Sequence, residues 1–289
     1  MRVVSTKAEL EAGLVELRRQ PGRVALVPTM GALHVGHEAL IDAARDVADA
    51  VVVSIFVNPL QFGRGEDLAS YPRTVHEDLA RCAEHDVDVV FMPDFETVYP
   101  GGDPRVTIEP GALATELEGV SRPGHFQGVL TVVVKLFGLV GPDVAVFGTK
   151  DYQQLVLVRQ CVSDLFLPVD ILGVETVRDD DGLALSSRNR YLSDEERPAA
   201  LALSRALRAG RQRAPAGAAA VLSAARVVLD DAPGMQTDYL ELRAADLGPA
   251  PAKGDARLLV AARVGPTRLI DNMAVVLGGD AETAMQQGV

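Results

Sequence analysis

Two histidines lie three residues apart in the segment "VPTMGALHVGH" (27–37), where an apolar run passes into a helix-like segment. If a helix opens at Gly36-His37, the side chains of His34 and His37 share one face of its first turn. The backbone N–H groups and the positive dipole end of such a helix favour an anion, above all a phosphate, and Gly36 permits close approach. The spacing therefore predicts a phosphate site in which imidazole N–H groups donate to oxygens that gain negative charge during a reaction.

Two alternative roles for the histidine pair remain open. Both side chains can be structural and simply cap a helix. A zinc site is the second alternative, but it requires a third ligand, and no neighbouring cluster of Cys, His or carboxylate residues supplies one.

Two further segments suit a nucleotide. In "VFGTKDYQQL" (146–155), Gly148 permits a tight turn after an apolar run, and Lys150 adds a mobile cation. In "GLALSSRNRYLS" (182–193), two hydroxyls and the guanidinium of Arg188 suit a triphosphate. Taken alone, the first segment also fits a solvated charge, and the second also fits a polar turn.

Two other polar segments are less specific. In "FVNPLQF" (56–62), Asn58-Pro59 predicts a turn, and Gln61 either faces solvent or forms hydrogen bonds with a buried ligand. The segment "ELEGVSRPGHFQG" (116–128) precedes a long apolar helix and is typical of a surface loop with a helix-capping histidine. It contains Glu118, Arg122 and His125.

Apolar runs alternate with helix-like segments through the first 176 residues. This pattern predicts a parallel sheet covered on both faces, the doubly wound α/β architecture, whose ligands bind beyond the carboxyl ends of the strands. The polar segments above lie at such ends. The expected strands are 24–28, 51–57, 87–92, 144–147 and 169–174, and the expected helices are 38–48, 74–85, 126–140 and 152–164.

The remaining residues have a different pattern and predict a second, smaller α+β domain. Ser193 and Glu196 are typical of a capping box that opens a helix ending near Gly210. We therefore expect one domain over 1–176 and another over 177–289. The second contains a further helix, 216–231, and strands at 237–243, 257–264 and 267–277.

The composition limits the possible partners. The net charge of −12 disfavours an extended contact with nucleic acid, although one cationic pocket still binds a nucleotide. The sequence contains no run of about 18 apolar residues, so we expect no membrane-spanning helix. Cys82 and Cys161 are far apart, form no CxxC pair and predict buried thiols in a reducing compartment, so we expect a cytoplasmic protein.

Taken together, these segments resemble those of the pantothenate synthetase (pantoate–β-alanine ligase) family. The resemblance extends over nearly the whole chain, through "PTMGALHVGH", "SIFVNPLQF", "YPRT", "KDYQQL", "LSSRNRYL", "DYLELR" and "LLVAARVGPTRLIDNM". It implies a Rossmann-like domain of the HIGH/KMSKS nucleotidyltransferase superfamily with an α+β lid over residues 177–289. His34-Val35-Gly36-His37 stands at the first signature of that superfamily, and Ser186-Ser187-Arg188 stands near the second.

The resemblance also implies the reaction. ATP and (R)-pantoate give pantoyl adenylate and pyrophosphate with Mg²⁺, and β-alanine then gives pantothenate and AMP. The implied catalytic residues are His37, as proton donor, His34 and Lys150, and the implied pantoate contacts are Gln61 and Gln154. No metal ligand is assigned. The resemblance also implies a homodimer. The implied ATP contacts are Met30, Gly31, Ala32, Leu33, His34, Val35, Gly36, His37, Gly148, Thr149, Lys150, Asp151, Val177, Leu185, Ser186, Ser187 and Arg188.

Two residues depart from the family pattern, since Val35 and Thr149 stand where the family usually has Glu. Both positions lie in the ATP-binding segments, and we interpret the differences as altered tuning of these segments with the activity retained. The alternative is that the protein is an inactive member of the family. Another nucleotidyltransferase, such as a nicotinamide-mononucleotide or pantetheine-phosphate adenylyltransferase, would lack the paired glutamines. A class I synthetase is disfavoured by the acidic charge and the length, and a non-catalytic α/β binding module would leave the two histidines, Lys150 and Arg188 unexplained.

Overall fold

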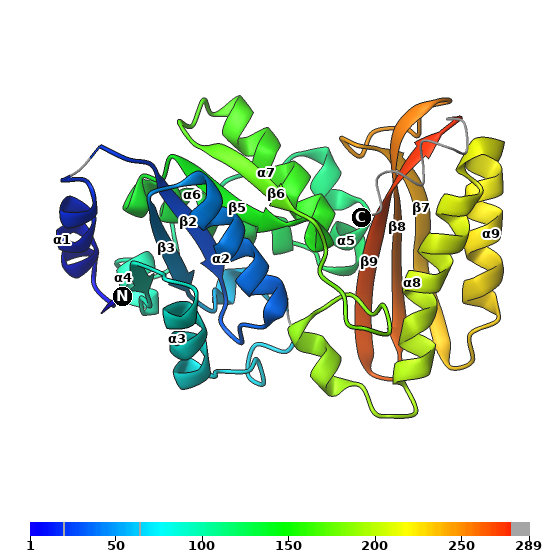
Figure 1. Ribbon diagram of the computed structural model, residues 1–289, viewed down its shortest axis with the longest axis horizontal. Coiled ribbons are helices and arrows are strands. Elements are labelled where there is room, and N and C mark those ends of the chain that lie inside the picture. Colours follow the sequence, from blue (N-terminus) through cyan, green and yellow to red (C-terminus); the bar gives the residue numbers. More distant parts are fainter. Residues whose placement is uncertain (20, 64, 279–289) are drawn as a thin grey trace. The chain divides into compact units, whose positions relative to one another are not determined.

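The computed structural model describes residues 1–19, 21–63 and 65–278, and the chain divides into two compact units (Figure 1). Unit 1 consists of Met1–Thr149 and Gln153–Thr176. Unit 2 consists of Lys150–Tyr152 and Val177–Val289, so a short segment between two elements of unit 1 belongs to unit 2.

Unit 1 is built on a parallel sheet with the strand order β1-β4-β3-β2-β5-β6. Valine-rich strands suit this position, because β-branched side chains pack well in a sheet that is buried on both faces. The described strands are β1 (Arg2–Val4), β2 (Val24–Thr29), β3 (Ala50–Ile55), β4 (Val89–Phe91), β5 (Val144–Gly148) and β6 (Asp170–Val174).

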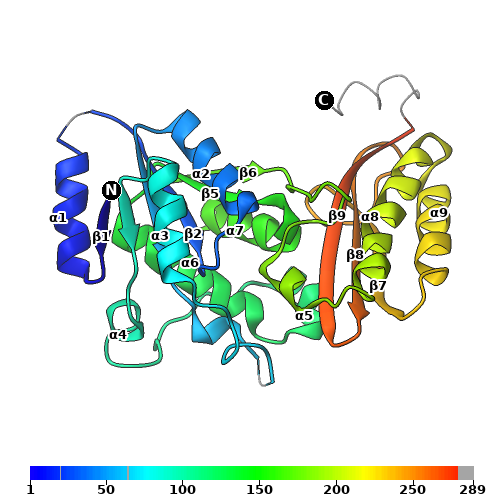
Figure 2. The same ribbon diagram turned by 60° about the horizontal axis from the view of Figure 1, so that its bottom comes forward.

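Helices cover the sheet of unit 1. Leu40, Ile41 and Ala44 of α2 form an apolar stripe that packs with Cys82 of α3 against alternate residues of β2, β3 and β5. The long apolar helix α6 contacts β2 and α1, as the turned view shows (Figure 2). The α-helices of unit 1 are α1 (Lys7–Leu17), α2 (Val35–Val47), α3 (Val75–Glu84), α4 (Phe95–Val98), α5 (Glu118–Ser121), α6 (His125–Val140) and α7 (Tyr152–Asp164), whose first residue falls in unit 2.

The strand order reverses between β2 and β5, which pair directly through Ala25 with Val144 and Leu26 with Ala145. In a doubly wound sheet, ligands bind outside the carboxyl ends of the strands at such a switch point. The chain leaves these two ends through the segment after Thr29 and the segment after Gly148. The topology therefore selects the two segments that the sequence also selected.

Unit 2 is an antiparallel sheet of order β7-β8-β9 with α8 and α9 packed on it (Figure 1). Leu203 and Leu207 of α8 meet Leu258 and Val260 of β8 in its core. Its elements are α8 (Arg197–Gln212), α9 (Ala218–Asp230), β7 (Met235–Ala244), β8 (Gly254–Val264) and β9 (Thr267–Leu277). Short 3-10 helices complete both units: η1 (Pro59–Gln61), η2 (Ala112–Thr115), η3 (Thr149–Asp151), η4 (Ser187–Tyr191) and η5 (Ala214–Ala216).

The predicted architecture is confirmed, but some local expectations are wrong. The sequence interpretation missed strand β1 and helix α1. Ser193 and Glu196 do form reciprocal hydrogen bonds of 3.0 and 3.2 Å, yet α8 begins only at Arg197. Gly210 lies near the end of α8, as expected, and a Cβ there would come within 2.6 Å of Leu258 Cδ2.

Both cysteines are free and buried, as predicted. Burial, together with the nearby carboxylate of Asp78, raises the pKa of the Cys82 thiol to about 11, so this side chain is a neutral packing residue at physiological pH. None of the helices in the described ranges is long and apolar enough to cross a membrane.

Candidate functional site

The two histidines of the opening segment cap the N-terminus of α2 reciprocally. His34 is the N-cap, and its Nδ1 accepts a hydrogen bond from the Gly36 N–H at 3.1 Å. The His37 Nδ1 accepts in turn from the His34 N–H at 3.3 Å, and the two ring centroids are 4.2 Å apart. The alternative of a capping role is therefore confirmed, since both histidines cap α2, and this role leaves the other ring nitrogen of each histidine out of the cap.

The capping geometry also fixes the protons of both rings. A nitrogen that accepts a backbone N–H bond carries no proton, so each neutral imidazole has its proton on Nε2. His34 and His37 are partly buried, and Val35 between them is 53% exposed. Each histidine therefore combines a structural Nδ1 with an Nε2–H that can donate to an anion.

A buried carboxylate holds the segment that leads into α2. Asp78 of α3, 1% exposed, accepts hydrogen bonds from the Ala32 N–H at 3.1 Å and the Leu33 N–H at 2.8 Å. Its Oδ1 also accepts from the Thr74 hydroxyl at 3.1 Å. Gly31 and Ala32 have φ of 82° and 50°, so Asp78 fixes a backbone conformation that is costly for a residue such as alanine.

Gln61 contacts the same segment. Its Nε2 lies 2.9 Å from the Met30 Sδ, and its Oε1 accepts from the Asn58 Nδ2 at 3.1 Å. Asn58 is fully buried and accepts at Oδ1 from the Tyr99 hydroxyl at 3.0 Å. Burial raises the pKa of the Tyr99 phenol, which keeps that hydroxyl a donor. The structure therefore brings together two of the predicted site residues, Met30 and Gln61, and orients the glutamine through Asn58.

A glycine permits the close packing around Gln61. Helix α6 passes η1 at Gly128, whose carbonyl accepts from the Asn58 Nδ2 at 3.1 Å. A Cβ at Gly128 would meet the Leu60 carbonyl and would lie 2.7 Å from the Gln61 nitrogen. Only glycine lets these two backbones approach so closely.

The backbone of Gln61 is held from the other side by His125 and Arg122. The guanidinium of Arg122 can only donate hydrogen bonds, and its Nη1 lies 2.9 Å from the His125 Nε2, so this ring nitrogen is an acceptor. The proton of the His125 ring is therefore on Nδ1, which donates to the Gln61 carbonyl at 2.7 Å. Arg122 also binds Glu66 at 3.0 and 2.6 Å. Burial opposes ionisation of Glu66, but the hydrogen bonds and charge of Arg122 outweigh it, so the pKa of Glu66 lies below its usual range. The expected surface loop is wrong for Glu118 and His125, which are both buried.

The adjacent glutamines of α7 have different environments. Gln153 is buried and binds the loop before α5, accepting from the Glu118 N–H at 3.0 Å and donating to the Leu113 and Glu116 carbonyls at 2.8 and 2.9 Å. Its hydrogen-bonding capacity is used structurally. Gln154 is partly buried in the first turn of α7.

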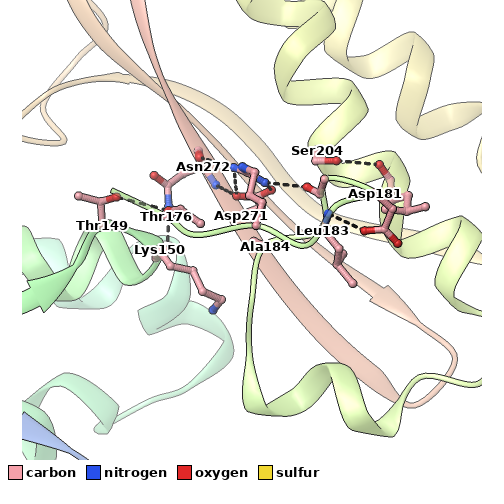
Figure 3. Close-up of polar contacts among 12 residues, drawn as sticks. Thr149, Lys150, Thr176, Asp181, Leu183, Ala184, Ser204, Asp271 and Asn272 are labelled. Carbon is pink, nitrogen blue, oxygen red and sulfur yellow. Dashed lines mark hydrogen bonds and ion pairs between the residues drawn. The ribbon is translucent and has the colours of Figure 1, made fainter. Parts of the chain in front are cut away.

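Gly148 and Thr149 lie at the carboxyl end of β5 in unit 1. Gly148 is the last residue of the strand, and the buried Thr149 hydroxyl lies 3.3 Å from the Thr176 hydroxyl (Figure 3). A glutamate in place of Thr149 would require space for a charged side chain in this buried position.

The other predicted nucleotide contacts lie in unit 2. Lys150 and Asp151 belong to η3, with 3.5 Å between the Lys150 Nζ and the Asp151 Oδ1. The Leu185 N–H donates to the Val177 carbonyl at 3.0 Å, which brings Val177 beside the segment 185–188. Ser186 Oγ accepts from the Arg188 N–H at 3.3 Å and starts η4, which contains Ser187 and Arg188.

The described part of the chain contains no group of three or more His, Cys, Asp or Glu side chains placed to hold a metal ion. A site built only from protein ligands is therefore not formed by these residues. Mg²⁺ commonly binds through substrate phosphates and retained waters, a mode that needs few protein ligands.

Sequence reasoning missed several residues that shape the site. Asp78 and Tyr99 lie in stretches with no recognisable motif, Asn58 was assigned only to a turn, and Gly128 was not singled out. The Asn58-Pro59 turn was the one usable signal, because asparagine caps η1 by accepting from the Leu60 N–H at 3.3 Å.

Fold and site together define the class of protein. A doubly wound sheet with a histidine-capped helix N-terminus at its switch point is a nucleotide-binding α/β fold. The sequence profile of the Pantoate-beta-alanine ligase family matches residues 2–274, and the chain belongs to this family.

Individual relatives agree with that assignment. The chain is 57% identical to the pantothenate synthetase of Mycolicibacterium smegmatis, with 97% of this chain and 90% of the relative covered. It is 60% identical to that of Saccharopolyspora erythraea, with 92% and 88% covered. The crystal structure of pantothenate synthetase from Thermus thermophilus matches with a TM-score of 0.88 at 50% identity, covering 94% of this chain and 99% of that one. A Francisella tularensis pantoate-beta-alanine ligase complexed with beta-gamma ATP and beta-alanine matches with a TM-score of 0.79 at 36% identity, covering 94% and 97%.

Proposed function

We propose that the protein condenses (R)-pantoate with β-alanine to form pantothenate. ATP and pantoate first give pantoyl adenylate and pyrophosphate, and the β-alanine amine then displaces AMP. The observation that carries the proposal is the family match over residues 2–274 of a chain whose α2 is capped by two histidines at the sheet's switch point. The Francisella tularensis relative, complexed with beta-gamma ATP and beta-alanine, supports ATP and β-alanine as substrates here.

In the first step, the pantoate carboxylate attacks the α-phosphorus of ATP and pyrophosphate leaves. The segment 30–37 receives the phosphates at the N-terminus of α2, where backbone N–H groups and the helix dipole attract anions. The Nε2–H groups of His34 and His37 donate to phosphate oxygens as charge moves onto the leaving group, so they stabilise the transition state more than the ground state. Lys150 and Arg188 reduce the repulsion between the carboxylate and the phosphates.

The glutamines select pantoate. Pantoate has two hydroxyls and a carboxylate, and an amide side chain supplies both a donor and an acceptor. Asn58 donates to the Gln61 Oε1, which turns the Gln61 amide and sets its donor group toward the segment at Met30. Gln154, partly buried at the start of α7, is the second pantoate contact.

The proposal assigns Mg²⁺ to the ATP phosphates, where it would neutralise charge on the departing pyrophosphate. It also assigns residues 1–176 to binding ATP and pantoate and residues 177–289 to a lid that excludes water from the adenylate. The proposal also includes a homodimeric assembly and a cytoplasmic location.

The role of His37 is tested by separating the two steps. His37→Ala should slow pantoyl adenylate formation by about 100-fold or more, with a smaller effect when adenylate is supplied with β-alanine. His76→Ala, an exposed histidine of α3, is the matched control and should stay near the wild-type rate. Normal adenylate formation by His37→Ala, with slow turnover of supplied adenylate, would refute the phosphate role.

A further inference from the structure

The segment Lys150–Tyr152 is anchored to the sheet of unit 2 by contacts at both of its ends. At one end, the Asn272 Nδ2 of β9 donates to the Lys150 carbonyl at 2.8 Å (Figure 3). At the other, the Arg257 guanidinium of β8 lies over the Tyr152 ring, 4.2 Å from its centroid. The Tyr152 hydroxyl donates to the Ala245 carbonyl at 2.9 Å.

The Asn272 amide has only one possible orientation. Its Oδ1 accepts from the Arg257 Nε at 2.6 Å, and a guanidinium is always a donor. Nδ2 must therefore face the Lys150 carbonyl. Asn272 is 3% and Arg257 5% exposed, so water does not compete readily for either contact.

The backbone of Asn272 is fixed as well. Its N–H donates to the Asp271 Oδ1 at 2.8 Å. Asp271, 4% exposed, is held by the two terminal nitrogens of Arg178 at 2.7 and 2.9 Å. A bidentate arginine–carboxylate pair fixes geometry as well as charge, so the donor to Lys150 rests on a rigid support.

We infer that Asn272 is a positioning residue for Lys150, an inference that rests on the proposed function. The Lys150 ammonium lies at the end of a flexible chain, and the side chain points away from the Asp271–Asn272 pair (Figure 3). Holding the main chain of Lys150 limits where the ammonium can reach, and catalysis is sensitive to displacements of about 1 Å. The sheet of unit 2 thereby determines the position of the Lys150 ammonium, which the sequence analysis assigned to the phosphates of ATP.

Two substitutions of Asn272 test the inference. Asn272→Asp keeps the size of the side chain and the pairing with Arg257, but it presents a carboxylate oxygen to the Lys150 carbonyl. Asn272→Ser is neutral and too short to reach that carbonyl. Each should slow pyrophosphate release from ATP and pantoate by about tenfold to 100-fold, with little change in the KM for pantoate, whose proposed contacts lie in unit 1.

A double-mutant cycle separates positioning from general damage. If Asn272 acts through Lys150, either substitution should have almost no further effect in a Lys150→Ala background. Asp238→Asn removes the negative charge that pairs with the Arg268 Nε at 2.6 Å in the same sheet, and it is the control that should leave the rate unchanged. Thermal unfolding of all variants establishes that the compared proteins are folded.

Three results would overturn the inference, and they differ in meaning. Rates within twofold of Asp238→Asn for both Asn272 variants would show that Lys150 needs no such support. The same fold loss in the presence and absence of the Lys150 side chain would show a merely structural role. A wild-type rate for Lys150→Ala would remove the role of Lys150 in the proposed function and the inference with it, whereas the first two results leave the proposed function standing.

Discussion

Replacing Asp78 by asparagine tests whether one buried carboxylate shapes the segment that is proposed to bind ATP. In the native protein, Oδ2 accepts from the Ala32 N–H, and Oδ1 accepts from the Leu33 N–H and the Thr74 hydroxyl. Asparagine has the same shape but only one acceptor oxygen. Its better orientation keeps the oxygen where it serves Leu33 and Thr74, and this leaves the amide NH₂ facing the Ala32 N–H.

The expected cost follows from these contacts. The unsatisfied, buried Ala32 N–H costs about 1–3 kcal/mol. The remaining bonds to Leu33 and Thr74 change from a charged to a neutral acceptor, which removes about 1 kcal/mol more. Asp78→Asn should therefore lower the free energy of unfolding by about 2–4 kcal/mol. Because Ala32 must then leave its left-handed conformation, the capping histidines shift, and the KM for ATP should rise.

Urea unfolding and pyrophosphate release at varied ATP measure the two effects. Thr74→Val is the matched control, because it removes one hydroxyl from the same carboxylate and leaves both backbone bonds intact. It should cost about 1 kcal/mol with no change in the KM for ATP. Equal stability and equal KM for ATP in Asp78→Asn and Thr74→Val would refute this role of Asp78.

Three further predictions concern the substrate contacts and their support. Lys150→Ala should slow pantoyl adenylate formation by about 100-fold, equivalent to about 3 kcal/mol of transition-state stabilisation, with little change in unfolding free energy; near-normal formation in a stopped-flow assay would contradict the assignment. Gln61→Ala and Gln154→Ala should each weaken pantoate binding by about 1–3 kcal/mol and spare ATP; equal losses for both ligands in calorimetry would place them in the nucleotide site. Gly128→Ala should lower the unfolding free energy by about 1–3 kcal/mol, because its Cβ would collide with the Leu60 carbonyl and displace η1; unchanged urea unfolding would contradict this.

The elements of unit 1 were predictable because their signals are local. The apolar runs are buried over all or nearly all of their residues, as in β3 and β2, and the helix of 126–140 is apolar on nearly every side. Strand β1 was missed because its three residues pair with β4 through contacts that only the fold creates. Gly210 was correctly expected near the end of a helix, but the sequence could not show that the side chain of Leu258 packs against it.

The site was predictable to the extent that one short segment contains its chemistry. His34 and His37 were found from their spacing, but the assignment of Nδ1 to capping and Nε2–H to donation needs the observed bonds. Asp78 acts on a segment more than forty residues earlier in the chain, and Asn272 acts on Lys150 from 122 residues away. Such contacts have no local pattern, so sequence reasoning had no means of finding them.

The proposed function requires that the protein activates pantoate as an adenylate before β-alanine takes part. Rapid mixing of the protein with ATP and pantoate alone tests this order of steps. We predict a burst of pyrophosphate equal to the concentration of active sites, with AMP released only after β-alanine is added. Pyrophosphate release that requires β-alanine from the start, or AMP formation without pantoate, would contradict it.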